Sequence, residues 1–235
     1  MIIILGAVES EIAAISKHLR SVNTIKVLER NFYRGHIGGN ELVVGTSGVG
    51  KVKSAIYIQK LIDTFPCECI FRLGTAGSLG DIQPLEIAVG NYVTYHDYSA
   101  HLLETQYPFL TNFPCDMKVV ECLTEFLCNK EVKFRIGKCL SGDYFVDRES
   151  LASRLCEEYN AICVDMESAS MAECAYINTV PYVSVNIITD VVSSNSSSDY
   201  HMRYFEASNF LGNRMADFFN EINILRIIRV PSASP

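Results

Sequence analysis

Three carboxylate residues lie close behind apolar runs of the sequence, where they are placed for acid–base chemistry. Glu11, Glu167 and Asp190 each come within a few residues of the end of such a run. A carboxyl group that is partly desolvated in a cleft can keep its proton and act as a general acid, and an ionised one can act as a base. Each also has an ordinary alternative, because Asp190 suits a turn or helix cap and the two glutamates suit the first turn of a helix.

Three glycine-rich turns also follow apolar runs, at residues 46–51 (TSGVGK), 73–77 (LGTAG) and 140–143 (LSGD). Glycine allows the backbone to approach a ligand closely, so these turns are candidates for holding a sugar, a base or an anion. None of them completes a nucleotide-binding fingerprint. Taken one at a time, each is equally compatible with a structural turn.

Metal and serine-hydrolase chemistry find little support in the sequence. The five histidines have no metal-ligand spacing, and no G-x-S-x-G elbow is present. The nine cysteines are scattered and odd in number, and Cys67 and Cys69 form the one close pair. We therefore expect core thiols in a reducing, cytoplasmic setting, no metal site and no cofactor.

The elements that must position these residues follow from apolar periodicity. Continuous Ile- and Val-rich runs, typical of strands covered on both faces, occupy residues 1–8, 41–46, 69–73, 87–95, 134–140, 161–164 and 182–188. Segments with helical periodicity lie at 9–19, 52–65, 117–127, 149–158, 167–176 and 200–222. This order predicts a single α/β domain with a largely parallel sheet, whose ligands gather at the carboxyl ends of the strands.

Charge and composition exclude several classes of partner. The 20 Lys and Arg against 27 Asp and Glu give a net charge of −7, without a basic run, so we expect no nucleic acid and no anionic membrane as partner. The short apolar opening is a strand rather than a signal peptide, and no segment approaches a membrane span. We expect one domain over 1–225 and a C-terminal tail over 226–235.

Six motifs taken together are more specific than any one of them. In order, they are GAVESE at 6–11, SGVGK at 47–51, GTAG at 74–77, SGDYF at 141–145, VDMESA at 164–169 and ITDV at 188–191. Their order and spacing resemble the methylthioadenosine/S-adenosylhomocysteine nucleosidase family across nearly the whole chain. The resemblance implies a nucleoside phosphorylase-like fold, in which helices flank a mixed, partly barrel-like central sheet, and a homodimer. It also implies a small-molecule nucleoside as substrate.

The resemblance also implies roles for residues in the matching motifs. Glu11 would activate water, and Asp190 would protonate N7 of the purine. Glu167 and Met166 would hold the ribose. The other substrate-binding positions implied are Val49 for the 5'-substituent, Phe145 and Val146 for the base, and Thr75, Ala76, Gly77 and Tyr200.

Two departures from the family pattern leave the 5'-substituent open. Arg72 precedes the 74–77 turn where these nucleosidases tend to carry a neutral residue and related phosphorylases carry a phosphate-binding arginine, and Asn186 stands where the nucleosidases usually have an arginine. Arg72 is thus a candidate anion-binding residue for phosphate or for an acidic substrate such as aminofutalosine or S-adenosylhomocysteine, and its alternative is a structural ion pair.

Three classes of function follow. The favoured one is hydrolysis of 5'-modified adenine nucleosides; the others are a phosphate-dependent purine nucleoside phosphorylase and a non-catalytic nucleoside-binding protein. Retention of Glu11, Glu167 and Asp190 argues against the third class. Glu11 also argues against the second, because a carboxylate repels phosphate.

Overall fold

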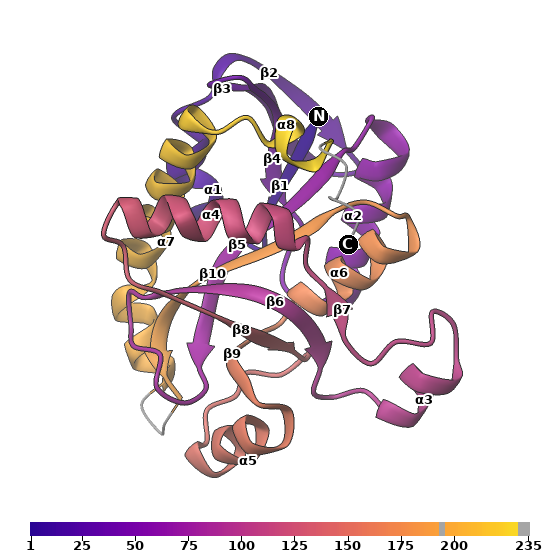
Figure 1. The fold of residues 1–235 in the computed structure, drawn as a ribbon, viewed down its shortest axis with the longest axis vertical. Coiled ribbons are helices and arrows are strands. Elements are labelled where there is room, and N and C mark those ends of the chain that lie inside the picture. Colours follow the sequence, from indigo (N-terminus) through magenta and orange to yellow (C-terminus); the bar gives the residue numbers. More distant parts are fainter. Residues whose placement is uncertain (193–195, 230–235) are drawn as a thin grey trace, which may run out of the picture.

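The computed structural model describes the backbone of residues 1–192 and 196–229, with side chains omitted for 196–202. Helices surround one 10-stranded sheet in this part of the chain (Figure 1). The strands are β1 (Ile2–Gly6), β2 (Arg20–Val27), β3 (Arg30–Ile37), β4 (Asn40–Thr46), β5 (Cys69–Ser78), β6 (Ile87–Tyr95), β7 (Phe113–Pro114), β8 (Phe134–Ser141), β9 (Ala161–Asp165) and β10 (Tyr182–Val191). The helices are α1 (Glu9–Ser16), α2 (Lys51–Thr64), α3 (Ala100–Thr105), α4 (Met117–Asn129), α5 (Glu149–Tyr159), α6 (Ser168–Ile177), α7 (Ser196–Glu221) and α8 (Ile224–Ile228).

The sheet closes on itself over part of its width. Its strand order is β10-β6-β8-β9-β5-β1-β4-β3-β2, and an additional pairing of β10 with β5 joins the two ends of the segment from β10 to β5. β5 therefore pairs with β1, β9 and β10 at different points along its length. The closed part is the partly barrel-like sheet that the family resemblance implied.

The pairing is mixed rather than largely parallel. β1 runs parallel to β4 and β5, and β10 runs parallel to β5, but β10 is antiparallel to β6 and β5 is antiparallel to β9. The order of strands and helices predicted a largely parallel sheet, and this prediction was wrong because parallel and antiparallel pairs occur side by side. A mixed α/β fold with flanking helices is confirmed.

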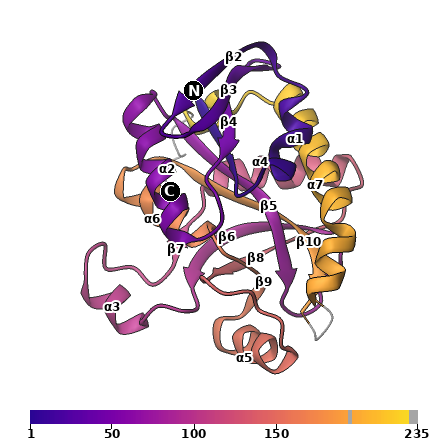
Figure 2. The same cartoon turned by 180° about the vertical axis from the view of Figure 1, so that it is seen from behind.

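The sequence reading missed the β2–β3 hairpin. β2 is exposed along most of its length, so it lacks the continuous apolar run that marks a strand covered on both faces. The hairpin lies at the end of the molecule opposite α5 in both views (Figures 1 and 2). The helix expected over 9–19 is also shorter than predicted, because α1 ends at Ser16 and the chain turns into β2.

The core is a layer of aliphatic and aromatic side chains between the sheet and its helices. The β1 residues Ile2 to Leu5 are completely buried, as a strand between β4 and β5 requires. α7 packs along α1 and β10, and Phe71 stacks edge-on against Phe219 with ring centroids 5.0 Å apart. α8 crosses the boundary expected at 225 and buries Ile224. Residues 230–235 of the expected tail lie outside the described part of the chain.

Strands β1, β5, β9 and β10 deliver the candidate residues to one place. Glu11 lies on α1 directly after β1, the 74–77 turn forms the end of β5, Glu167 follows β9, and Asp190 lies near the end of β10. Because β1, β9 and β10 all pair with β5, segments far apart in sequence meet there.

Candidate active site

A cavity of about 180 Å³ lies at this meeting point. Its lining comes from β1 and α1, the turn before α2, β5, the segment after β8, the β9–α6 junction and β10. The lining residues are Ala7, Val8, Glu11, Val49, Arg72, Thr75, Ala76, Gly77, Tyr144, Phe145, Val146, Val164, Asp165, Met166, Glu167, Thr189 and Asp190.

Glu11 is held by backbone and side-chain donors from two elements. One carboxylate oxygen accepts the N–H of Ala7 at 2.6 Å and of Val8 at 3.3 Å, at the start of its own helix. The other accepts the N–H and the hydroxyl of Thr75 at 2.8 and 3.0 Å. The side chain is thus fixed in one orientation, although it sits in the first turn of a helix where a freely solvated glutamate is common.

Glu167 is similarly fixed at the junction of β9 and α6. One carboxylate oxygen accepts the N–H of Gly50 at 2.9 Å, and the other accepts an Arg72 N–H at 2.9 Å. Gly50 has a φ of 99°, which glycine adopts without strain, and this conformation turns its N–H toward Glu167 as α2 begins. The glycine-rich 46–51 turn therefore donates a backbone hydrogen bond to a carboxylate of the cavity.

A further carboxylate, Asp165, connects this junction to β8 and β10 through hydrogen bonds. It accepts hydrogen bonds from the Ser141 hydroxyl at 2.6 Å, from the N–H of Glu167 at 3.1 Å and from the Asn186 amide at 3.3 Å. The hydroxyl and N–H of Ser168 also donate to it. With so many donors, Asp165 is suited to orienting the β9–α6 turn.

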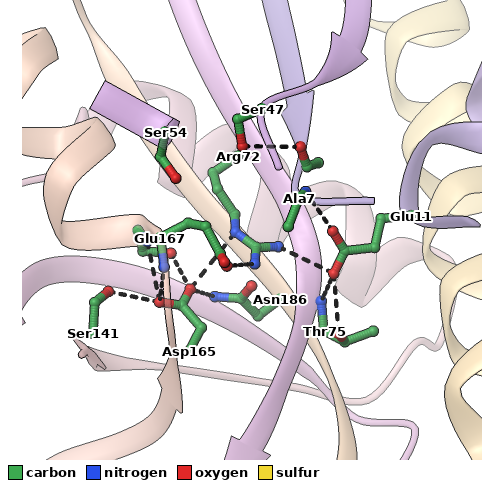
Figure 3. A network of polar contacts seen from close by, with 12 residues as sticks. Ala7, Glu11, Ser47, Ser54, Arg72, Thr75, Ser141, Asp165, Glu167 and Asn186 are labelled. Carbon is green, nitrogen blue, oxygen red and sulfur yellow. Dashed lines mark hydrogen bonds and ion pairs between the residues drawn. The ribbon is translucent and has the colours of Figure 1, made fainter. Parts of the chain in front are cut away.

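Arg72 lies at the centre of these carboxylates (Figure 3). Its guanidinium is 2.9 Å from Glu167, 3.6 Å from Asp165 and 3.8 Å from Glu11, and the side chain is 1% exposed. Burial by itself lowers the pKa of Arg72, but the three carboxylates outweigh burial and raise that pKa, so the group stays charged. These are the contacts of a structural ion pair, the alternative considered from the sequence.

The carboxylates around Arg72 outnumber the cation. Burial raises the pKa of Glu167 to about 7; Arg72 opposes this shift, while Asp165 and Glu11 add to it. Within the described residues that line the cavity, Arg72 is the one basic side chain. Protonation of Glu167 is therefore easier than in a solvated glutamate.

Asp190 enters the same cavity from β10. Its side chain is 1% exposed and accepts the Thr189 hydroxyl at 2.8 Å. The lining around it includes Gly77, Val164 and Val146. An almost fully buried carboxyl group in such surroundings suits a general acid better than a solvated turn residue does.

The opposite wall comes from loops and is much less buried. Val49, Tyr144 and Phe145 are 43%, 43% and 45% exposed. The 141–145 segment is tied back at Asp143, whose side chain accepts the N–H of Lys51 at 2.8 Å. Lys51 in turn reaches Asp97 at 2.6 Å. The two loops that carry Val49 and Phe145 are thus linked to each other.

The site residues expected from the sequence meet in this cavity, with one exception that cannot be placed. Tyr200 belongs to the residues whose side chains lie outside the described part of the chain. Sequence reasoning did not assign Tyr144, Thr189 and Asp165 to the site, although each directly precedes or follows an assigned residue within the same motif. Spacing alone could not show which neighbours face the cavity.

Nothing in the described residues forms a group of three or more His, Cys, Asp or Glu side chains arranged to hold a metal ion. All nine cysteines are free thiols. The helices within the described ranges include none that is long and apolar enough to cross a membrane.

Comparisons with known proteins agree with this fold and cavity. The family model of the phosphorylase superfamily matches residues 1–224. A 5'-methylthioadenosine/S-adenosylhomocysteine nucleosidase of Baumannia cicadellinicola is 30% identical over 205 residues, which are 84% of this chain and 89% of the relative. The chain belongs to the phosphorylase superfamily, and the resemblance to the methylthioadenosine/S-adenosylhomocysteine nucleosidases is confirmed.

Two solved structures show the same fold. S-adenosylhomocysteine nucleosidase from Streptococcus pyogenes in complex with 5-methylthiotubericidin superposes with a TM-score of 0.88 at 24% identity, covering 94% of this chain and 97% of that one. Futalosine hydrolase of Helicobacter pylori superposes with a TM-score of 0.87 at 22% identity, with the same coverage.

Proposed function

We propose that this protein hydrolyses the N-glycosidic bond of a 5'-modified adenine nucleoside and releases adenine. The observation that carries the proposal is one cavity that holds Glu11 and Glu167 beside a buried arginine together with a separate buried carboxyl group, Asp190. The nucleosidase relatives support the same reaction class.

In this reaction Glu11 acts as the base. Water attacks the anomeric carbon of the ribose, and Glu11 accepts a proton from it, while the bond to the purine breaks. The four hydrogen bonds to Glu11 fix its carboxylate before the reaction begins, which avoids the cost of orienting it later. The sugar leaves as a free ribose derivative.

Asp190 and Glu167 complete the mechanism. Negative charge develops on the departing base, and a proton from Asp190 to N7 neutralises it. Glu167, with Met166 beside it, holds the ribose through its hydroxyl groups, and the carboxylates stabilise the oxocarbenium character of the sugar. Phe145 stacks on the purine, and the backbone of Val146 contacts its edge.

The position of Arg72 favours water over phosphate as the attacking group. A phosphate ligand would have to compete for the guanidinium with Glu11, Asp165 and Glu167, which already surround it. Phosphate in the same place would meet these carboxylates at close range, and the repulsion between buried like charges is large. The second candidate, a phosphorylase, is therefore disfavoured.

The deciding experiment is base release in phosphate-free buffer. Purified protein is incubated with methylthioadenosine, S-adenosylhomocysteine and aminofutalosine, and adenine and the sugar product are identified by mass spectrometry. We expect adenine and a free 5'-modified ribose. A requirement for added phosphate, or accumulation of a sugar 1-phosphate, would contradict hydrolysis.

The contacts of Arg72 also bear on the 5'-substituent. Its guanidinium is engaged with three carboxylates of the protein, Glu11, Asp165 and Glu167. An acidic substituent thus gains no partner from Arg72. We propose that methylthioadenosine is a better substrate than S-adenosylhomocysteine or aminofutalosine, both of which carry a carboxylate in the 5'-substituent, and the same incubation ranks them by kcat/KM.

A homodimer is proposed from the apolar surface next to the cavity. Val52 and Ile56 are exposed on α2, Tyr176 is exposed on the adjacent α6, and Tyr107 and Phe109 are exposed after α3. These elements lie on the same side of the molecule in both views (Figures 1 and 2). A cluster of this kind marks an interaction surface.

Sedimentation velocity tests the dimer. The double substitution Val52→Glu with Ile56→Glu is expected to give monomer, whereas Val22→Glu on the exposed β2 strand is not. A monomeric wild-type protein would contradict the proposal.

Free thiols at all nine cysteines support action in a reducing compartment, which we propose is the cytoplasm.

A further inference from the structure

Arg72 reaches the carboxylates by passing over Gly74, two residues further along the same strand. Side chains two residues apart in a strand point to the same face, so residue 74 stands in the path of Arg72. A Cβ atom built on Gly74 would lie 0.9 Å from Nη1 of Arg72 and 2.0 Å from its Cζ. The guanidinium therefore occupies the volume that any other side chain at position 74 would fill.

The same crossing explains how a fully buried arginine contacts three carboxylates from two segments, α1 and the β9–α6 junction. Glu11 lies on α1, Asp165 at the end of β9 and Glu167 at the start of α6, and Arg72 approaches all of them from β5. Figure 3 shows the guanidinium between Glu11 on one side and Glu167 on the other. Without it, these buried carboxylates would face each other with no cation among the described lining residues.

The contacts of the guanidinium are mostly electrostatic. Nη2 donates to Glu167, but Nε and Nη1 have no hydrogen-bond partner within the described residues, and they lie 3.6 Å from Asp165 and 3.8 Å from Glu11. Burial leaves them no bulk water to contact. A buried cation in this position favours the ionised forms of the carboxylates around it.

We propose that Arg72 is a positioning residue for the proposed hydrolysis and that Gly74 is its obligatory partner, because only glycine at 74 lets the guanidinium lie between Glu11 and Glu167. Arg72 holds Glu11 and Glu167 on either side of its guanidinium in the orientations that the base and the ribose ligand need, and its charge opposes the rise in the pKa of Glu167. The inference rests on the proposed function for its kinetic consequence. Its structural part, the placement of the cation by Gly74, is independent of that function.

The titratable groups around the guanidinium define the pH range of a test. They are Glu11, Asp165 and Glu167, together with Tyr182 on β10 and Cys163 on β9. Burial raises the pKa of Tyr182, and the hydrogen bond with Cys139 together with burial raises that of Cys163, so both stay neutral below pH 8. Changes between pH 5 and 8 that occur in a variant of this cluster and not in a control variant then report on Glu167.

Gly74→Ala tests the proposal without removing any charged group. The added methyl displaces the guanidinium, so Glu167 loses the cation that lowers its pKa and binds a proton more tightly. We expect kcat/KM at pH 6 to fall at least about tenfold, with a smaller loss at pH 8, since one pKa unit corresponds to a tenfold change in the ionised fraction. A pH profile parallel to that of the wild type would overturn the proposal.

Gly137→Ala is the matched control. Gly137 is also a strand glycine, and a Cβ there would lie 2.6 Å from Cγ2 of Ile162, so it introduces a milder clash against an uncharged side chain. We expect it to lower the melting temperature without changing the shape of the pH profile. The same change of shape in Gly137→Ala would attribute the effect to general loosening and overturn the assignment to Arg72.

Urea unfolding from pH 5 to 8 separates this inference from the proposed function, because it needs no substrate. In Gly74→Ala the free energy of unfolding should decrease more steeply with rising pH than in Gly137→Ala, since the carboxylates ionise without their cation. Equal slopes would overturn the placement of Arg72 by Gly74. Wild-type protein without nucleosidase activity would overturn the proposed function alone.

Arg72→Lys is a second variant that tests the proposal if Gly74→Ala does not fold. Lysine keeps the charge but has a single compact ammonium group in place of the guanidinium fork, so it cannot approach three carboxylates at once. We expect kcat/KM at pH 6 to fall at least about threefold relative to its value at pH 8. An unchanged ratio would overturn the proposal.

Discussion

The cavity has a buried charged wall and an exposed loop wall, and the two are built in opposite ways. Glu11, Arg72 and Glu167 on the charged wall are 3%, 1% and 3% exposed, and each is bound by donors or acceptors from another element. Val49 and Phe145 on the loop wall keep more than two fifths of their surface exposed. The charged wall is fixed by the fold, whereas the loop wall has surface left to bury.

This difference indicates which kinetic quantity each wall controls. Side chains that are already oriented and desolvated lower the barrier of the chemical step, so their loss reduces kcat. Apolar side chains with free surface gain contact when a ligand binds, so their loss weakens binding and raises KM. The following substitutions test that division.

Glu11→Gln should have the largest effect. The amide keeps the size of the side chain but cannot accept the proton of the attacking water, so we expect kcat to fall by at least about 10³-fold. Steady-state release of adenine, followed in a coupled absorbance assay, measures it. Circular dichroism checks that the fold is intact. A decrease in kcat of less than tenfold would show that Glu11 is not the base.

Asp190→Asn should come next. Because asparagine cannot give its proton to N7 of the purine, kcat should fall by at least about 10²-fold while KM changes little. A substrate whose base leaves without protonation should recover much of the lost rate. Near-wild-type turnover of adenine nucleosides by this variant would show that Asp190 is not the acid.

Glu167 should make the stability of the charged wall depend on pH. Its folded-state pKa of about 7 lies above the usual 4.5, so the folded state binds more protons between these values. The associated stability is fully present below about pH 4.5 and is lost as the pH rises through about 7. Glu167→Gln should flatten this part of the urea-unfolding profile. An unaltered slope would mean that Glu167 does not titrate in this range.

Phe145→Ala should have the smallest effect on kcat. Removing a half-exposed ring from the loop wall deprives the purine of its stacking partner, so we expect KM to rise about three- to tenfold with kcat within about threefold of the wild type. Tyr144→Ala on the same loop is the comparison. A large loss of kcat with unchanged KM in Phe145→Ala would break the division between the two walls.

The sequence by itself determined much of this protein. Runs rich in apolar residues marked β1, β5, β6, β8 and β10, because strands that pack against the core admit few polar residues. The six motifs then located Glu11, Glu167 and Asp190 at strand ends, and these three residues line one cavity. Such features depend on local pattern and order, which a sequence records directly.

The tertiary structure alone decided how these pieces combine. The closure of the sheet through the β10–β5 pairing, and the antiparallel pairs within it, arise from long-range contacts that leave no local signal. The exposed β2 strand likewise owes its place to hydrogen bonds with β3 and not to its own apolarity. The role of Arg72 was the feature that the sequence left most open and that the structure was most needed to define. Its three carboxylate neighbours come from two segments far apart in the sequence, and the need for glycine at position 74 is evident only when the path of the guanidinium is known.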